Sequence, residues 1–596
     1  MKRGKKKQTK ADENLLPVDA QKEKRLDFLA IFLLLGFGIY HSIIYWGHQP
    51  VPHFDFRCFT NLGREILNFQ MPSSFKRLPL LGILQIALGK ISGGTYSDFT
   101  GGWLLNSILH PLNAVLIFLI AKRIVPKAAF WIALIAMLNP LVLQLLTESI
   151  AETALLFGFL ITFYFIVKRS NWVYLCAGLT SMIRYEGAVL IFIAFVLDMI
   201  NASDNKKRFR SFLYAAAASV PIVIWLVATF VNWQSTGSTH YFKEFGQQSG
   251  GKIIFLKYLT LTWGVTFRPL MVANPLFMPQ CMAPVYIVSK IIIAAGFVLG
   301  CIFATVKKNY NVLAMIFFLT IYLFIHAVHS WTFQRFCMPI MWIPLVVFCY
   351  GVQNVWKILK DRNWLPAPLQ TIGLLIISAA SILLITAFTT YLPKISSKSQ
   401  ASIYIPSISS TILIIFCVGR VLVNGLRRLP REITIAAFVM LMIISNQITL
   451  AYVVGNGDRD IEFRYLLDWY LENAEPGEKM ALTVPIILQT MSPDREECFV
   501  HTNSFDADNP KDFANECRQR NISYVAWDSR MGLVPRSRYY KSWKMSNIAP
   551  LQKPADSKDY EFIKTIVANR RRYINLFKLK NPRQNNPRLC GNQNKK

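Results

Sequence analysis

Residues 171–200 read NWVYLCAGLTSMIRYEGAVLIFIAFVLDMI, and this stretch decides the fold class. Two apolar runs of membrane-helix composition flank the tetrapeptide Arg184-Tyr185-Glu186-Gly187. An arginine and a glutamate inside such sequence carry a large free-energy cost unless they face a partner or water. We therefore predict a membrane-spanning chain in which this tetrapeptide marks a functional site.

The composition of the whole chain supports this interpretation. Of the 596 residues, 53% are hydrophobic and only 17% are charged, and the mean hydropathy is +0.33, which excludes a soluble domain of this size. The formal net charge is +31, but the lysines and arginines fall mostly in short segments between apolar runs and at the two ends. This distribution indicates membrane topology and contact with anionic lipid rather than nucleic-acid binding.

Apolar runs close to the length that crosses a bilayer, about 20 residues, predict an α-helical, multi-pass membrane protein with thirteen spans. Seven basic linkers fall on one side of these spans, which the positive-inside rule makes cytoplasmic. The N-terminus is then cytoplasmic, the odd count puts the C-terminus outside, and a plasma or inner membrane is the expected location. The predicted spans are 27–45, 103–121, 128–146, 151–167, 172–183, 187–200, 211–231, 280–305, 311–328, 336–356, 367–390, 401–424 and 432–454.

After residue 455 the apolar runs shorten to strand length. Residues 479–484, 497–501 and 522–527 are predicted strands and 510–520 a helix, so we expect a small extracytoplasmic α/β domain. From Arg570 the chain is basic and poor in apolar residues, which predicts a frayed tail. The predicted organisation is a basic cytoplasmic tail (1–26), a transmembrane domain (27–454) with an outer loop (46–102), the α/β domain (455–569) and a basic tail (570–596).

Neither the cysteines nor a nucleotide motif adds a function. The ten cysteines form no Cys-x-x-Cys pair and several lie inside spans, so we expect neither a metal cluster nor a disulfide framework. No cofactor is expected. Cys498 and Cys517 could bridge in an oxidising compartment, although free thiols are the expected state. Residues 246–252 match G-x-x-x-x-G-K, but Ile253 replaces the required Ser or Thr and no strand precedes the motif, which argues against ATP binding.

The ionisable residues that are hardest to place all gather on the predicted outer face. They are Asp55, Lys76 and Arg77 in the outer loop, Glu148 and Glu152 at the start of the fourth span, Arg184 and Glu186 between the fifth and sixth, and His326, His329 and Arg335 around the turn between the ninth and tenth. Separate linkers thus deliver acids and bases to one membrane surface.

Most of these residues also have an ordinary structural explanation. Glu148 and Glu152 are spaced i to i+4, so they would share one helix face, and a helix N-terminus favours carboxylates. Arg184 and Glu186 could pair at a helix junction, Arg335 could snorkel to the interface, and Lys76 with Arg77 could meet lipid headgroups. The two histidines lie near a membrane interface, where histidine is common. Asp55 is the hardest to explain in this way, because an aspartate between aromatic residues gains nothing from packing at a membrane surface.

The set as a whole suits the chemistry of a lipid-linked phosphate. Lys76, Arg77, Arg184 and Arg335 could hold its oxygens, because guanidinium groups bind phosphate in a bidentate fork and lysine adds a point charge. A carboxylate nearby could remove the proton from an acceptor hydroxyl or amine as it attacks. Phosphate is a good leaving group, so a base and a cationic clamp suffice for sugar transfer from a polyprenyl phosphate.

The sequence resembles the GT-C superfamily of integral membrane glycosyltransferases, in particular the branch with protein O-mannosyltransferases and bacterial aminoarabinose transferases. The thirteen spans and the outer C-terminal domain resemble that branch, so the likeness covers nearly the whole chain. The motifs that carry it are short, and their order and common sidedness give them weight. They are His53-Phe54-Asp55, Phe75-Lys76-Arg77-Leu78-Pro79-Leu80, Thr147-Glu148 through Glu152, Arg184-Tyr185-Glu186-Gly187 and Gln334-Arg335-Phe336-Cys337-Met338-Pro339.

The resemblance implies a dolichyl- or undecaprenyl-phosphate-linked donor, transfer of a hexosyl or pentosyl group on the extracytoplasmic face, inversion at the anomeric carbon, and no catalytic metal. The acidic residue of the first outer loop is catalytic in that family, which corresponds to Asp55 here. Many members have an Asp-Glu pair at this point, whereas Phe56 follows Asp55 in this chain. That departure leaves open whether Glu148, Glu152 or Glu186 assists.

The resulting hypothesis assigns Asp55 as the general base. Lys76, Arg77 and Arg335 contact the donor phosphate, and Arg184 with Glu186 is an orienting pair at the donor pocket; His329 is a further possible site residue. The acceptor is left open among protein, lipid and polysaccharide. The alternatives are a secondary transporter or lipid flippase, which would place its charges near the membrane midplane, and a homologue without catalytic activity.

Overall fold

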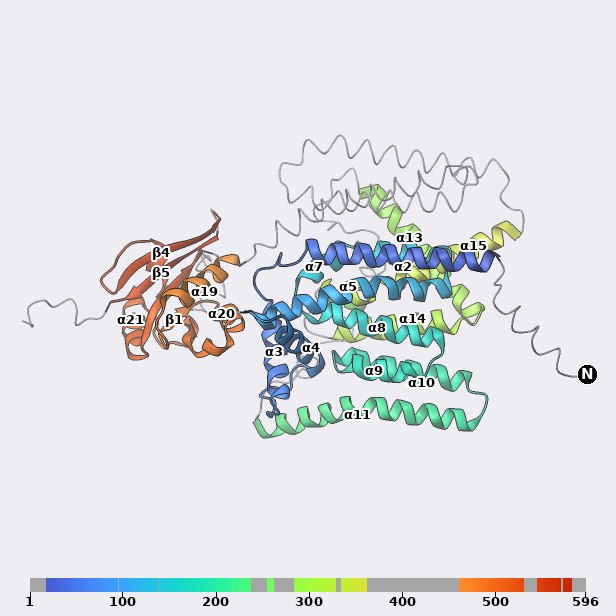
Figure 1. Cartoon of the computed structure of the whole chain (residues 1–596), viewed down its shortest axis with the longest axis horizontal. Helices are drawn as coiled ribbons and strands as arrows, with labels where there is room; N and C mark the ends of the chain where they lie inside the picture. Colours follow the sequence, from blue (N-terminus) through green and yellow to red (C-terminus); the bar gives the residue numbers. More distant parts are fainter. Residues whose placement is uncertain are drawn as a thin grey trace, which may run out of the picture. The chain divides into compact units, whose positions relative to one another are not determined.

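Apolar helices dominate the computed structural model of this chain, which describes residues 18–94, 96–137, 139–236, 254–261, 283–328, 334–361, 460–529, 544–569 and 572–580 (Figure 1). Within these ranges, five helices are long and apolar enough to cross a membrane. They are Lys24–Ile44, Ser97–Ile124, Ala151–Lys168, Asn205–Gln234 and Tyr310–Val328. The predicted class, a helical membrane protein with a small C-terminal sheet, is thereby confirmed.

The full number of spans stays a prediction. The predicted spans 367–390, 401–424 and 432–454 lie outside the described residues. The cytoplasmic position of the N-terminus and the outer position of the C-terminal domain are likewise predictions.

Two compact units make up the chain. The first, called the helical unit below, comprises Met1–Trp46, Leu62–Gln85 and Gly102–Val453. The second, the sheet unit, comprises Gly47–Asn61, Ile86–Gly101 and Val454–Lys596. Two segments of the predicted outer loop 46–102 therefore pack with the C-terminal domain, and Asp55 lies in one of them.

Long helices of the helical unit lie side by side in Figure 1. Contacts join α8 to α9, α9 to α10, α10 to α11, and α13 to α15. Three of the described helices of this unit extend into segments of the sheet unit. The described helices that contribute to the helical unit are α2 (Val18–Ile44), α3 (Phe54–Leu67), α4 (Pro79–Ser92), α5 (Ser97–Ile124), α6 (Ala129–Met137), α7 (Pro140–Thr147), α8 (Ala151–Lys168), α9 (Trp172–Ser181), α10 (Ala188–Asn201), α11 (Asn205–Thr236), α13 (Ala283–Val306), α14 (Tyr310–Val328) and α15 (Trp342–Asp361).

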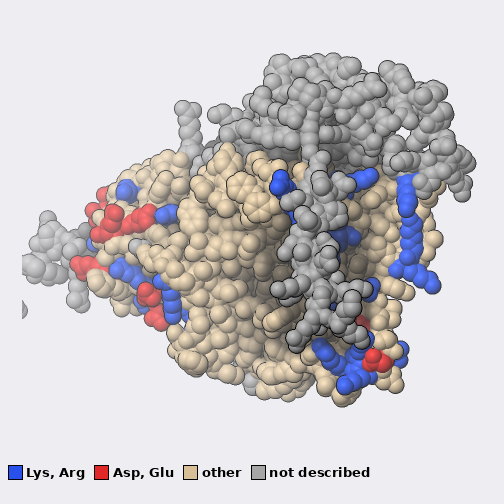
Figure 2. All heavy atoms as spheres, turned by 45° about the vertical axis from the view of Figure 1, so that its right-hand side comes forward, with Lys and Arg blue, Asp and Glu red and all other residues tan. Residues whose placement is uncertain are grey.

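The direction of the chain separates two ends of this unit. Because α8, α9, α10 and α11 follow one another through short connections and pack together, successive helices run in opposite directions. The turns 169–171 and 202–204 therefore lie at one end, and the turn 184–187 lies at the other. The basic linkers at Lys168-Arg169 and at 206–208 belong to the first end. In Figure 2 the visible face of the helical unit is mostly uncharged, with Lys and Arg gathered toward the right-hand side.

The predicted span 128–146 is broken in the structure. Residues 128–146 were expected to form a single helix, but α6 ends at Met137 and α7 begins at Pro140. Proline has no backbone N–H and disfavours the helical conformation of the residue before it, here Asn139, which explains the break.

The sheet unit contains a five-stranded mixed sheet with the order β2-β1-β3-β5-β4. Strand β1 pairs in parallel with β2 and β3, whereas β5 is antiparallel to β3 and β4. The strands β1, β2 and β3 and the helix α21 confirm the sequence prediction for this region. The elements are α19 (Ile461–Asn473), β1 (Lys479–Leu482), α20 (Pro485–Met491), β2 (Phe499–His501), α21 (Pro510–Gln519), β3 (Ile522–Asp528), β4 (Tyr560–Asn569) and β5 (Arg572–Leu579).

The prediction of a frayed tail from Arg570 is wrong for residues 572–579. These residues form β5, an inner strand of the sheet, in which Ile574, Leu576 and Phe577 are fully buried. The many basic residues around this strand lowered its average hydropathy, although the apolar positions needed for a buried strand are present. Cys498 and Cys517 are both free thiols, as expected.

Candidate functional site

The Arg184-Tyr185-Glu186-Gly187 turn is a short 3₁₀ helix, η2 (Tyr185–Gly187), between α9 and α10. Its tight packing requires glycine at position 187. A Cβ atom there would lie 2.6 Å from the backbone carbon and oxygen of Thr180, closer than nonbonded atoms approach. The turn therefore lies directly against the end of α9, and Arg184 and Glu186 project from a fixed backbone.

Glu152 connects the two arginines that the sequence analysis singled out. It lies in the first turn of α8, and its Oε1 is 3.5 Å from Arg184 Nη1 and 3.5 Å from Arg335 Nε. The carboxylate is 3% exposed, while the arginine side chains are 11% and 18% exposed. One buried acid thus holds arginines that are about 150 residues apart in sequence.

Glu186 joins the same group from the other side. Its Oε1 lies 3.7 Å from Arg184 Nε and 3.3 Å from His326 Nε2, and both Glu186 and His326 are nearly fully buried. We call Glu152, Arg184, Glu186, His326 and Arg335 the charge cluster. Helix α8, the η2 turn, the last turn of α14 and η6 (Gln334–Ile340) each supply members of it.

An aromatic ring lies at the centre of the cluster. The guanidinium groups of Arg184 and Arg335 lie 4.9 and 5.3 Å from the centroid of the Phe336 ring, and the His326 ring stacks on it at 5.0 Å with an interplanar angle of 19°. The Tyr322 hydroxyl donates a hydrogen bond to the carbonyl of Phe336 at 2.7 Å. Cation–π contacts and this hydrogen bond fix the orientation of the two arginines.

Two carboxylates and two guanidinium groups balance the formal charge of the cluster when His326 is neutral. Taking such ions out of water is costly, and mutual pairing offsets the cost. The cluster is therefore an ordered, electrically balanced arrangement. Arg335 is its most exposed member at 18%, which makes it the group that an incoming anion reaches most readily.

The segment with Lys76 and Arg77 packs beside the η2 turn. Phe75 packs against Trp225 with ring centroids 5.0 Å apart and an interplanar angle of 49°, and the two residues share a hydrophobic cluster with Leu78 and Tyr185. Arg77 lies within electrostatic range of the Tyr185 hydroxyl. The predicted grouping of these cations with the tetrapeptide therefore has a packing basis.

Glu148 lies outside helix α8, so the expectation that it shares a helix face with Glu152 is wrong. It lies between α7, which ends at Thr147, and α8, which begins at Ala151. Its carboxylate accepts a hydrogen bond from Gln144 Nε2 at 3.0 Å.

Asp55 lies in the first turn of α3, in the part of that helix that belongs to the sheet unit. Its backbone N–H donates to His53 Nδ1 at 3.1 Å, and its carboxylate Oδ2 lies 3.7 Å from the same nitrogen. The Asp55 side chain is 26% exposed. This carboxylate is therefore held in a turn and accessible to solvent.

His326 is a member of the charge cluster that was not among the predicted site residues. His326 was interpreted as an ordinary interfacial residue, yet it pairs with Glu186 inside the cluster. A polar residue in the last turn of an otherwise apolar span was the signal available. His329, the histidine included in the predicted site, lies outside the described residues.

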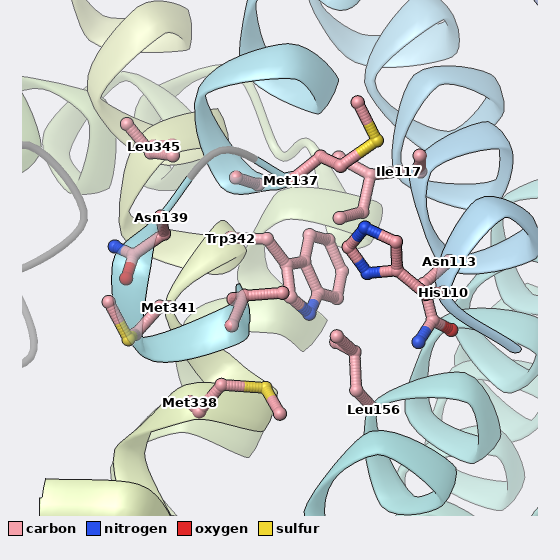
Figure 3. A pocket seen from close by; sticks show the side chains of 13 residues that line it. His110, Asn113, Ile117, Met137, Asn139, Leu156, Met338, Met341, Trp342 and Leu345 are labelled. Atoms are coloured by element: carbon pink, nitrogen blue, oxygen red, sulfur yellow. The ribbon is translucent and has the colours of Figure 1, made fainter. Parts of the chain in front are cut away.

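A pocket in the helical unit, lined mostly by apolar side chains, was not predicted. Figure 3 shows a pocket in which the Trp342 indole extends toward His110 of α5. Three methionines lie around it, one from α6, one from η6 and one just before α15. His110 Nε2 lies 3.4 Å from Nδ1 of the buried His41. Asn113, 3% exposed, donates to the Thr153 carbonyl at 3.3 Å. The polar residues in this pocket were hidden within apolar spans.

The architecture that carries the charge cluster is the fold of the GT-C membrane glycosyltransferases. ArnT from Cupriavidus metallidurans bound to undecaprenyl phosphate, an aminoarabinose transferase, is similar with a TM-score of 0.55 and 12% identity, covering 92% of this chain and 97% of ArnT. Its apo state gives the same TM-score at 11% identity. The resemblance predicted from the sequence is thus confirmed for the fold.

A more distant similarity is to the oligosaccharyltransferase AglB from Archaeoglobus fulgidus, in complex with an inhibitory peptide and a dolichol-phosphate. It has a TM-score of 0.46 and 12% identity, covering 94% of this chain and 75% of that one. No protein-family model matches the chain, and no curated protein matches it by sequence.

Proposed function

We propose that this protein is a membrane glycosyltransferase that moves a sugar from a polyprenyl-phosphate-linked donor to an acceptor on the extracytoplasmic face, with inversion at the anomeric carbon. The charge cluster carries this proposal. It gathers Glu152, Arg184, Glu186 and Arg335 at the end of the helices opposite the basic linkers, and those linkers favour the cytoplasm. The GT-C fold of ArnT, whose structure holds undecaprenyl phosphate, supports the same donor class.

The donor phosphate contacts Arg335 first. This arginine is paired with Glu152 and is the most exposed member of the cluster, so it is the member that a phosphate oxygen reaches most readily. Lys76 and Arg77, packed beside the η2 turn, supply further positive charge. Arg184 stays between Glu152 and Glu186 and keeps the site ordered. Hydrogen bonds from these cations to a phosphate oxygen are charge-assisted, and such bonds are stronger than those between neutral groups.

Asp55 is the general base of the proposed reaction. It takes the proton from the acceptor hydroxyl or amine, the acceptor atom forms its bond to the anomeric carbon, and the bond from that carbon to the phosphate oxygen breaks. The leaving group is polyprenyl phosphate, and its negative charge is stabilised by the bound cations. A single displacement of this kind inverts the anomeric configuration.

The test uses the purified full-length protein, a panel of radiolabelled undecaprenyl-phosphate and dolichyl-phosphate sugars, and membranes of a deletion strain as the source of acceptor. Asp55→Asn should lower the transfer rate about 10²–10⁴-fold, the usual contribution of a general base, and should still bind undecaprenyl phosphate. Asp494→Asn, which changes an exposed acid of the sheet unit, is the control and should match the wild type.

Arg335→Ala should weaken binding of undecaprenyl phosphate about 10–100-fold, as expected for loss of a charged hydrogen bond. Lys207→Ala is the control for a lost cation. Wild-type rates in Asp55→Asn would remove this aspartate from the mechanism. A wild-type protein that neither binds undecaprenyl phosphate nor transfers sugar from any donor would refute the proposed function itself.

A further inference from the structure

We propose that the sheet unit positions Asp55, and that it does so through Arg57 and its two partners, Glu496 and Gln489. The inference rests on the proposed function for the role of Asp55, while the contacts themselves do not depend on it. It gives the C-terminal domain a task within the reaction, which its sequence did not reveal.

Arg57 lies two residues after Asp55 on α3. Its Nη1 donates a hydrogen bond to Gln489 Oε1 at 2.7 Å, and its Nη2 forms an ion pair with Glu496. The Arg57 side chain is 20% exposed and that of Glu496 is 38% exposed. Both partners belong to the C-terminal domain, from α20 and from the 3₁₀ segment Pro493–Cys498.

The side-chain amide of Gln489 is itself fixed in orientation. Its Nε2 donates to the carbonyl of Phe499 at 2.8 Å and to that of Glu496 at 3.4 Å. An amide that uses its nitrogen on two carbonyls must present its oxygen to a donor, and Arg57 is that donor. The binding position for the guanidinium is therefore built into the start of β2.

The chain before Asp55 is also anchored in the sheet unit. Val51 is 2% exposed and belongs to the hydrophobic core around the sheet, and the Pro50 carbonyl accepts a hydrogen bond from Arg464 at 3.5 Å. On the other side, the fully buried Phe56 packs edge-to-face on Phe99 with centroids 5.6 Å apart. Asp55 thus lies in a short stretch that is fixed at both ends.

This arrangement leaves the carboxylate accessible while its backbone is held. Asp55 is 26% exposed, but its neighbours Phe56 and Val51 are buried. A general base must lie within hydrogen-bond reach of the proton it removes, and a misplacement of about 1 Å can cost about 10²-fold in rate. Arg57 is therefore a positioning residue that acts through Asp55 and need not touch the substrate.

The experiment compares Glu496→Gln with Glu497→Gln in the full-length protein. Glu497 is the next residue, also acidic and exposed, so it controls for lost charge in the same place. The structural readout is the rate at which a maleimide labels Cys58, the exposed thiol next to Arg57 on α3; Cys58→Ser gives the background. Glu496→Gln should raise this rate about fivefold, the equivalent of about 1 kcal/mol for a partly exposed ion pair.

The kinetic readout separates positioning from donor binding. Glu496→Gln should lower kcat while leaving the KM for the donor and the affinity for undecaprenyl phosphate unchanged. Combining Arg57→Glu with Glu496→Arg should restore part of the kcat that each single charge reversal removes, because the exchanged charges can pair again. A general effect on folding would lower the yield of all three variants without such rescue.

Unchanged Cys58 labelling in Glu496→Gln would overturn the proposal, as would an equal increase in Glu497→Gln. Faster labelling with unchanged kcat would also overturn it, because the contact would then hold α3 without serving the reaction. If the wild type transfers no sugar, the proposed function fails, and the labelling rates still decide whether Glu496 holds the segment around Asp55.

Discussion

The charged turns at the two ends of helix α10 differ in how deeply they are buried and in which groups they pair with. At its start, Arg184 and Glu186 are 11% and 2% exposed and are paired with groups from other helices. Beyond its end, Asp204 and Lys207 are 51% and 67% exposed and pair only within their own turn, i to i+3, at 3.8 Å. One helix thus separates a built site from a solvated linker.

The difference teaches how charge is used in a membrane protein. At the exposed end, the charges need no fixed geometry, because water and lipid headgroups solvate them and only their number and sign matter. At the buried end, each charge must have a partner, and the partners must come from sequence-distant helices. Composition shows the first use, whereas the second appears only after folding.

The largest expected effect concerns the side of the membrane from which each end of the helical unit can be labelled. Ser203→Cys in the exposed turn should react with a membrane-impermeant maleimide only in inside-out vesicles, and the exposed Cys58 only in right-side-out vesicles. The physical reason is the positive-inside rule applied to the basic linker at 206–208. The measurement is peptide mass spectrometry of the labelled protein in both preparations, with Cys58→Ser as background. Labelling of both thiols from the same side would refute the proposed topology.

Removing one cation from each end tests the energetic contrast. Arg184→Ala leaves Glu152 and Glu186 buried with one partner fewer, so it should destabilise the protein by about 3–5 kcal/mol. Lys207→Ala removes half of an exposed pair and should cost less than about 1 kcal/mol. Thermal unfolding of the detergent-purified variants measures both. Equal losses for the two variants would mean that the charge cluster is no more than a surface ion pair.

The same contrast explains what was predictable from sequence. The helices α8, α9, α10 and α14 match the predicted spans, since an apolar run flanked by polar residues leaves one way to bury itself in lipid. The strands β1 and β3 were recognisable for a similar reason. Strand β5 was missed because its flanking basic residues hid its buried positions, Ile574, Leu576 and Phe577.

The candidate site was only partly predictable. The sequence identified Glu152, Arg184, Glu186 and Arg335 as unusual, because ions in apolar sequence are costly. It suggested the pair of Arg184 with Glu186, but not the ion pairs of Glu152 with the two arginines, which depend on how α8, η2 and η6 pack. The proline that begins α7 broke a predicted helix, and Glu148 lies in the connection between α7 and α8. His326 gave no signal beyond being polar.

A substitution at Gly187, which changes the backbone packing of the buried turn, should give the smallest and most specific of these effects. Gly187→Ala places a methyl group 2.6 Å from the Thr180 carbonyl, and both are backbone-held, so the turn must shift. Overpacking of this kind costs about 1–3 kcal/mol, and the displaced Glu186 should weaken the binding of undecaprenyl phosphate. Gly36→Ala is the control, because a Cβ on that helical glycine meets no atom within 4 Å; it should preserve stability, since alanine favours helix. Thermal unfolding and binding are measured on both. A Gly187→Ala variant as stable as Gly36→Ala would show that the turn can move freely, and the fixed geometry of the charge cluster would then need another source.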